Sequence, residues 1–507
     1  MDLSFEKEQL SGFRPLPEKT VCQEELLESI VPDACPDIAR IAAVNGTVLI
    51  SDVQSRDGSV SVNGKIQTVT LYEGENGGLL SQISVSLPFT CQQNISGLTE
   101  SGKIRVRTCL RQAEVKVLNP RKILIRANIL LVLTAYQPFV QELCTAVCCG
   151  HEENICQLNS FCDCSCIQSV ENKSFEFEDQ IRLKYSRGES LQVLHADAVP
   201  TCSEYRLIGR KLIFKGNASL TFLIQNDSGT AETLAEDLPI SQIIEVPSGG
   251  EDRSCELSLT LQDFTFIPSA EDPQLISVYV KILACAAVST HKSISVLEDL
   301  YSTARTACCE LQPFTFSCFS ADSTLPQTVR ELIETESEVR SVIGCSVEIG
   351  ELARNDGENG AELTAEILLS VLWQDHEETI RQSHKTVRAA FRPDQADTYH
   401  FSCMPPSDVY AVPFADGIEV RFTVELRCRA EREKTIQMIS GASLGELRNS
   451  QDNHCRPSLI LRLPSEGERL WDIAKAYGTT EEQILRANGL EPGVLPTDHM
   501  LLIPSIR

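Results

Sequence analysis

The sequence predicts a multidomain, mainly β protein in which three β-sandwich-like repeats precede a small β-α-α-β module. One observation is that long stretches alternate apolar and polar residues and recur with a spacing of roughly 150 residues, the size of whole domains. Another is that residues 461–504 switch from a two-residue period to a helical period between two short apolar runs. A chain of 507 residues is too long for one hydrophobic core, so several domains are expected.

Each repeat begins with a long alternating strand that is followed by a turn. Alternation over so many residues indicates a strand with one buried face. The apolar members are Val60, Val62 and Ile66 in copy one, Leu212, Phe214, Ala218, Leu220, Phe222 and Ile224 in copy two, and Leu363, Ala365, Ile367, Leu369, Val371 and Trp373 in copy three.

Each repeat closes with a second alternating strand. Its apolar members are Ile123, Ile125, Ala127, Ile129 and Leu131 in copy one, Ile276, Val278, Val280 and Ile282 in copy two, and Ile418, Val420, Phe422, Val424 and Leu426 in copy three. The intervening residues in copy three are all polar, which predicts an antiparallel sheet with one buried and one solvent-exposed face. Strands separated by Gly, Asn and Asp turns favour β-sandwiches over βαβ units, with the topology open.

The C-terminal stretch predicts two short helices. An apolar stripe at helical spacing is formed by Leu470, Ile473, Ala474 and Tyr477, and Gly478 follows as a helix C-cap. Thr479 and Glu482 stand in capping-box relation and open a second helix, with Ile484 and Leu485 inward, which Asn488 and Gly489 close. Two flanking strands are expected at Leu459, Leu461 and Leu463 and at Leu501, Leu502 and Ile503.

This order, with GERLWDIAKAYGTTEEQILRANGL and the closing LLIP, resembles the LysM family, whose members generally bind glycans containing N-acetylglucosamine, such as peptidoglycan. The resemblance implies a shallow groove between the loop entering helix one and the loop leaving helix two. Its lining would be Gly467, Glu468, Arg469, Leu470 and Trp471 on one side and Gly489, Leu490, Glu491 and Pro492 on the other.

Three features bear on that groove. Asp498 and His499 stand where the family often has a glycine-containing turn, and the groove carries acidic residues on both sides. Leu470 could equally be a core residue. Trp471 could also be a core residue, but it lies off the main apolar stripe, so of the two it is the better candidate for a ligand contact.

The first repeat carries a further signature, VPDACPDIARIAAVNGTVLISDVQSRDGSVSVNGKIQTVTLYEGE, from Val31 to Glu75, followed later by NPRKILIRANI. It resembles the SPOCS domain, a spore-coat-associated module of endospore-forming bacteria. The family's Pro-Asp pair would be Pro36 and Asp37, and its Arg-Lys pair Arg121 and Lys122. Copies two and three keep the strand pattern but lose the Pro-Asp motif.

Three such repeats followed by one LysM module resemble the SipL family of spore coat morphogenetic proteins. The resemblance implies a non-catalytic adaptor that tethers the coat base layer to the forespore surface, with the LysM module binding the coat base-layer ATPase. It also places the protein in the cytoplasm of the mother cell. Two alternatives stay open: a peptidoglycan-binding LysM protein of the cell or spore wall, and a structural coat protein crosslinked through cysteines.

The predicted organisation has seven segments. They are SPOCS-like domains at 20–143, 171–290 and 327–430, a Cys-rich linker at 144–170, further linkers at 291–326 and 431–456, and the LysM module at 457–507. The two later linkers are polar or contain proline, which is typical of mobile connections.

The Cys-rich segment permits three interpretations. It contains Cys144, Cys148, Cys149, Cys156, Cys162, Cys164 and Cys166, together with His151. These side chains are numerous enough for zinc, but two separated CxxC knuckles are absent. Interchain oxidation and a flexible linker of reduced thiols are the alternatives.

Composition and motif content limit the classes of binding partner and of catalytic activity that we expect. With 71 acidic and 45 basic residues the formal net charge is −26, which disfavours nucleic acid and anionic lipid. The start, MDLSFEKEQLSGF, has no secretory pattern and no apolar run reaches bilayer length, so we expect neither export nor membrane insertion. No GxSxG, P-loop or HExxH motif is present, and we expect no enzyme activity and no cofactor.

Overall fold

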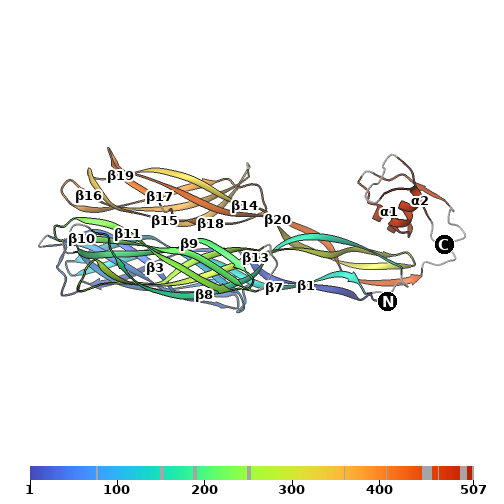
Figure 1. Cartoon of the computed structure of the whole chain (residues 1–507), viewed down its shortest axis with the longest axis horizontal. Coiled ribbons are helices and arrows are strands. Elements are labelled where there is room, and N and C mark those ends of the chain that lie inside the picture. Colours follow the sequence, from blue (N-terminus) through green and yellow to red (C-terminus); the bar gives the residue numbers. More distant parts are fainter. Residues whose placement is uncertain are drawn as a thin grey trace.

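The computed structural model describes residues 1–75, 78–148, 154–185, 191–247, 253–358, 360–406, 408–447, 459–465, 467–491 and 499–504. Almost all regular structure in these ranges is β-strand, and both described helices lie in the C-terminal module. Figure 1 shows an elongated molecule with packed sheets at one end, a narrow stalk of strands in the middle and the helices α1 and α2 at the other end.

The first repeat is a sandwich of two antiparallel layers. One layer is a three-stranded meander in the order β3-β4-β5, and the other places β7 between β6 and β2. The turns Asp57-Gly58 between β3 and β4 and Pro120-Arg121 between β6 and β7 are two residues long, which suits strands that return alongside their neighbour. The bounds are β2 (Lys19–Ile30), β3 (Ile38–Arg56), β4 (Ser59–Gly74), β5 (Ser81–Asn94), β6 (Lys103–Asn119) and β7 (Lys122–Val147).

The second and third repeats have the same two-layer plan. The meanders are β9-β10-β11 and β15-β16-β17, and the other layers are built on β13 and β20. The second repeat uses β8 (Ile155–Arg182), β9 (Leu191–Ile208), β10 (Lys211–Asn226), β11 (Ala231–Glu245), β12 (Arg253–Pro268) and β13 (Leu275–Ser302). The third uses β14 (Arg305–Glu334), β15 (Val339–Gly357), β16 (Gly360–Asp375), β17 (Ile380–Phe391), β18 (Thr398–Met404), β19 (Val409–Phe414) and β20 (Gly417–Leu447).

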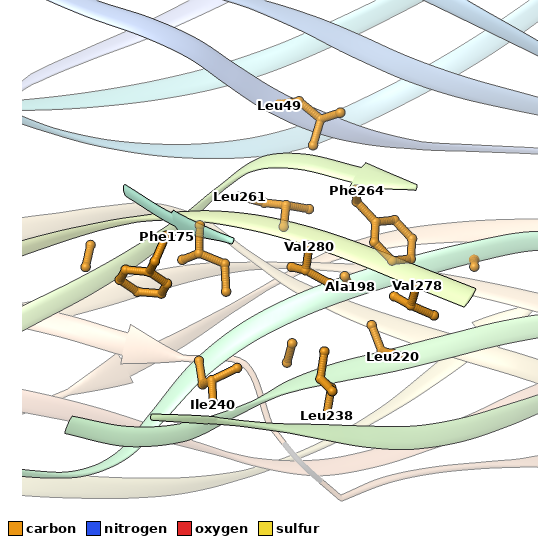
Figure 2. Packing of buried hydrophobic residues seen from close by; sticks show 14 of the residues in the cluster. Leu49, Phe175, Ala198, Leu220, Leu238, Ile240, Leu261, Phe264, Val278 and Val280 are labelled. Atoms are coloured by element: carbon orange, nitrogen blue, oxygen red, sulfur yellow. The ribbon is translucent and has the colours of Figure 1, made fainter. Parts of the chain in front are cut away.

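The predicted alternating strands form the cores of these sandwiches, which confirms the mainly β fold class. The first set lies in β4, β10 and β16, the central strands of the three meanders, and the second set lies in β7, β13 and β20. Every apolar residue predicted for the first set is at most 2 % exposed. Figure 2 shows the core of the second repeat, where Leu49 from β3 of the first repeat joins Leu261 and Phe264 in one cluster.

The three sandwiches pack against one another as well as around their own cores. Thr47 Oγ1 donates to Asp197 of the second repeat at 2.6 Å, and the Val44 amide donates to Gln382 of the third repeat at 2.8 Å. Residues from all three repeats line a cavity of about 1920 Å³ between them. No described residue of the C-terminal module lines this cavity, so it is separate from the predicted groove.

Beyond the sandwiches, the long strands continue as three two-stranded ribbons that we call the stalk. Its pairs are β1 (Phe5–Pro15) with residues 136–147 of β7, residues 155–167 of β8 with 289–302 of β13, and residues 305–319 of β14 with 431–447 of β20. Between ribbons, single bridges are formed by Phe13 with Ile167 and by Ser317 with Ser165. Side-chain packing between the ribbons, together with backbone hydrogen bonds between residues 1–3 and Ala442 and Leu444 of β20, holds the stalk together.

The stalk corrects the prediction of linkers. The described parts of 144–170, 291–326 and 431–456 lie mainly in β7, β8, β13, β14 and β20. These segments form strands because each continues a sandwich strand and buries one narrow face against two other ribbons. Leu143, Val296, Phe314 and Met438 form part of that buried core. The predicted domain boundaries themselves stay predictions.

Candidate functional site

The C-terminal module has the predicted β-α-α-β order. Its elements are β21 (Ile460–Arg462), α1 (Leu470–Tyr477), α2 (Glu481–Asn488) and β22 (Leu501–Ile503), and β21 pairs with β22. Gly478 and Gly489 end the two helices in the left-handed region, at φ 66° and 63°. Ile473, Ala474 and Ile484 are buried, so the predicted apolar stripe is the core of the module.

The capping box of the second helix lies one residue later than predicted. Thr480 is the N-cap, and its side chain accepts from the Gln483 amide while the Gln483 side chain accepts from the Thr480 amide. Thr479 is instead fully buried. Both threonines are followed three residues later by a residue that can complete a capping box, so the sequence pattern alone did not separate them.

The loop entering α1 forms the first side of the predicted groove. Gly467 has a φ of 80° and open space around it, and the carboxylate of Glu468 accepts from Arg462 at 2.5 Å. Leu470 is half-buried and packs against the module core. The question left open for Leu470 is thus answered in favour of packing, with part of its side chain still accessible.

The loop leaving α2 forms the second side. The Leu490 amide donates to Leu485 at 3.0 Å, and its side chain packs against the same core as Leu470. Glu491 is exposed and makes no ion pair with any residue the structure describes. Pro492 and Asp498 lie outside the described residues. On this second side, which we call the open side, the described residues Gly489 and Glu491 are exposed and Leu490 is packed.

Trp471 makes a contact of a different kind from the predicted one. Its side chain is 4 % exposed, and its Nε1 donates to Asp299 Oδ2 at 2.8 Å. Its ring also meets the ring of Tyr301 edge to face, with centroids 4.8 Å apart. Asp299 and Tyr301 belong to β13 at the end of the stalk, so the indole that was expected to contact a ligand contacts the protein itself.

Further polar contacts join the same surfaces. Lys475 Nζ lies 2.7 Å from both carboxylate oxygens of Asp299, and Arg469 Nη1 lies 3.0 Å from Glu298. The Tyr301 hydroxyl donates to the Thr479 carbonyl at 2.7 Å. Hydrogen bonds to Asp472 and to Glu298 raise the pKa of Arg469 above its ordinary value. We call Arg469, Trp471, Lys475 and Thr479 the docking face of the LysM-like module.

Local strand geometry explains why the stalk can present two consecutive acidic side chains. The pairing of β13 with β8 shifts register between Leu297 and Asp299, so Glu298 occupies a β-bulge. A bulge re-aims side chains that would otherwise point to opposite faces of the strand. Asp299 and Tyr301 are two residues apart and share a face, which brings both to the docking face.

The two motifs of the first repeat meet at one site. Arg121 Nη1 donates to Asp37 Oδ1 at 2.9 Å and to the Cys35 carbonyl at 2.7 Å. Its Nη2 donates to the carbonyls of Val31 and Pro32, each at 3.1 Å. The Pro-Asp loop and the turn before β7 are thereby held together by one guanidinium.

The predicted cysteine cluster is divided between the stalk core and its end. Cys162 and Cys164 are buried on one face of β8, and burial raises the pKa of the Cys164 thiol to about 12. Cys144 and Cys166 also have pKa values raised by burial, whereas Cys148 is exposed. Cys149 and His151 lie outside the described residues. Among the residues the structure describes, no three His, Cys, Asp or Glu side chains are arranged for a metal ion.

The docking face was not predicted as a contact with the rest of the chain. Acidic Glu298 and Asp299 lie in a segment that was assigned to a linker, and nothing local to them indicates that the partner of Asp299 lies 172 residues later. The alternation in the sequence FCDCSC could have identified β8, because cysteine is often a buried small hydrophobe.

Comparisons with known proteins agree with this geometry. Residues 37–118 match the family model described as SipL, SPOCS domain, and residues 465–504 match the model of the LysM domain. The first match begins at the clamped Asp37, and the second spans both helices. Neither a curated protein nor a solved structure matches the chain. Neither of the described helices is long and apolar enough to cross a membrane.

Proposed function

Because the chain carries a SipL SPOCS domain and a LysM domain, we propose that it is a non-catalytic adaptor in endospore coat assembly. Both are families of binding domains. In this proposal the chain tethers the coat base layer to the forespore surface, and it acts in the mother cell. The coat base-layer ATPase is the proposed partner of the LysM module.

The observation that carries the proposal is the separation of two kinds of surface along one elongated chain. The sandwiches lie at one end and the LysM module lies at the other, with the stalk between them (Figure 1). Two distant binding surfaces on one chain suit a bridge, because the first contact raises the effective concentration for the second. Three sandwiches also offer more than one contact area without a single tight site.

The test is capture of the purified base-layer ATPase by two immobilised proteins, the full chain and a chain lacking Leu461 to Arg507. We expect capture by the full chain and its loss from the shortened chain. The control is thermal unfolding of both proteins, which reports whether the sandwiches stay folded. Equal capture by two folded proteins would contradict the assignment of the LysM module as the partner site.

A second candidate is peptidoglycan binding, which the LysM match favours. It predicts that the full chain is retained on insoluble peptidoglycan, whereas the adaptor predicts no retention. A Trp471→Ala variant would not separate the two, because Trp471 also contacts the stalk. Glu491→Lys is the better variant, since Glu491 is an exposed residue of the open side of the groove.

A further inference from the structure

We propose that the stalk is an internal ligand of the LysM groove, and that a partner must displace it to use the α1 side of that groove. The inference rests on the proposed function, since it concerns regulation of the same binding site. The partner would present the chemistry that Glu298, Asp299 and Tyr301 present now. That chemistry is a protein segment with two carboxylates followed closely by an aromatic ring.

The contact is too specific to be a chance approach of two domains. The indole N–H and the Lys475 ammonium converge on one carboxylate, that of Asp299, whose side chain is only 19 % exposed. A carboxylate placed there has its oxygens satisfied by two donors and sits beside an aromatic ring. The docking face therefore has the donors and the ring of a receptor, and the stalk supplies the complement.

The occupied surface overlaps the predicted ligand surface. Arg469 and Trp471 belong to the α1 side of the groove, and both are engaged by the stalk. Glu491 on the opposite side makes no described contact with the stalk. A ligand could thus approach the α2 side while the module is docked, but it reaches the indole only after the stalk has left.

The docked module is held in a way that permits release. All hydrogen bonds between the module and the stalk in the described ranges involve a side chain, and no backbone ladder joins them. Eleven residues, 448–458, connect the end of β20 to the start of the module. A short connection keeps the local concentration of the internal ligand high, so a competing segment binds with reduced apparent affinity.

Two charge reversals separate docking from partner recognition. Asp299→Lys removes the internal ligand and leaves the docking face intact, whereas Lys475→Asp disrupts the docking face itself. Asp163→Lys is the matched control, because Asp163 is an exposed stalk carboxylate on β8. Both Asp299→Lys and Lys475→Asp should release the module, but only the first leaves a surface that can take the partner.

Release can be measured without a partner. The chain has two tryptophans, and Trp373→Phe leaves Trp471 as the sole indole. In that background we expect acrylamide quenching of Trp471 to rise several-fold in Asp299→Lys and in Lys475→Asp, and to stay unchanged in Asp163→Lys. Equal quenching in all these proteins would contradict the claim that contact with the stalk shields Trp471.

The competition is then tested by capture of the base-layer ATPase. We expect the apparent Kd of Asp299→Lys to fall by about tenfold, as removal of a competing state allows, and that of Lys475→Asp to rise. If both released variants bind as the parent does, the internal-ligand proposal is wrong although the proposed function holds. If no variant, the parent included, captures the ATPase, the proposed function fails, and so does the competition proposed here.

Discussion

Arg121 and Asp299 each collect several hydrogen bonds, but they join different kinds of structure. Arg121 lies within one sandwich and donates to backbone carbonyls of a neighbouring loop as well as to Asp37. Asp299 lies on the stalk and accepts from side chains of a separate module. The Arg121 clamp fixes a loop within one fold, whereas the contact at Asp299 joins two modules without a backbone ladder and can open. Arg121 is therefore a structural site, and Asp299 belongs to the site whose release is proposed above.

The largest expected effect is on the structural site. Arg121→Ala removes the donor to Asp37 and three carbonyls, and hydrogen bonds from a charged group contribute about 1.5–3 kcal/mol each when intact. Because Arg121 is one-third exposed, we expect a total loss of only about 2–3 kcal/mol in the free energy of unfolding. Urea denaturation measures it. The control is Arg126→Ala on the same strand. An equal loss of unfolding free energy in that variant would contradict the role given to the hydrogen bonds of Arg121.

The next effect concerns the dependence of docking on salt. Raising the salt from 0.1 M to 1 M shortens the Debye length from about 10 Å to about 3 Å. The pairs Arg469–Glu298 and Lys475–Asp299 should weaken together by up to about 1 kcal/mol, since they are partly exposed. Quenching of Trp471 in the Trp373→Phe chain measures this. Salt-independent quenching would mean that the ion pairs contribute nothing to docking.

A smaller effect belongs to the module alone. Thr480→Ala removes the N-cap of α2 and should lower the stability of the LysM module by about 1 kcal/mol. The sandwiches should be unaffected, because Thr480 makes no described contact with them. Amide hydrogen exchange resolved by peptide measures both regions in one sample. Faster exchange throughout the sandwiches would show that module and body unfold together.

The smallest effect on stability is expected at the open side of the groove. Glu491→Lys should change the free energy of unfolding by less than about 0.5 kcal/mol, as exposed substitutions usually do. Docking of Trp471 should also be unchanged. Changed ATPase capture would assign the α2 side to the partner site, and unchanged capture would restrict recognition to the α1 side.

The sequence was informative where neighbouring residues determine structure. The alternation in β4, β10 and β16 identified the cores of the sandwiches, and the apolar stripe of α1 identified the LysM-like helices. Pro36–Asp37 and Arg121–Lys122 were recognised as motifs, although only the fold shows that Arg121 reaches Asp37. In these cases the signal is local: a repeating apolar pattern, a helix cap or a sequence motif.

The stalk and the docking contact escaped prediction for a different reason. Each ribbon buries a narrow face against ribbons from distant parts of the chain, so its strands contain many polar residues, proline and cysteine. The pattern therefore indicated linkers. Likewise, the sequence indicated a contact for Trp471, but the structure buries Trp471 beside Ile473 and Ala474, and its partner Asp299 is set by tertiary packing and by a bulge.

The central claim is that the LysM module covers the end of the stalk with one side of its groove. Hydroxyl-radical footprinting of Tyr301, read by mass spectrometry, tests it most directly, because Tyr301 is 2 % exposed beneath Trp471. We expect low modification in the intact chain and a several-fold rise in the chain lacking Leu461 to Arg507. Equal modification of Tyr301 in the two proteins would contradict the docked arrangement.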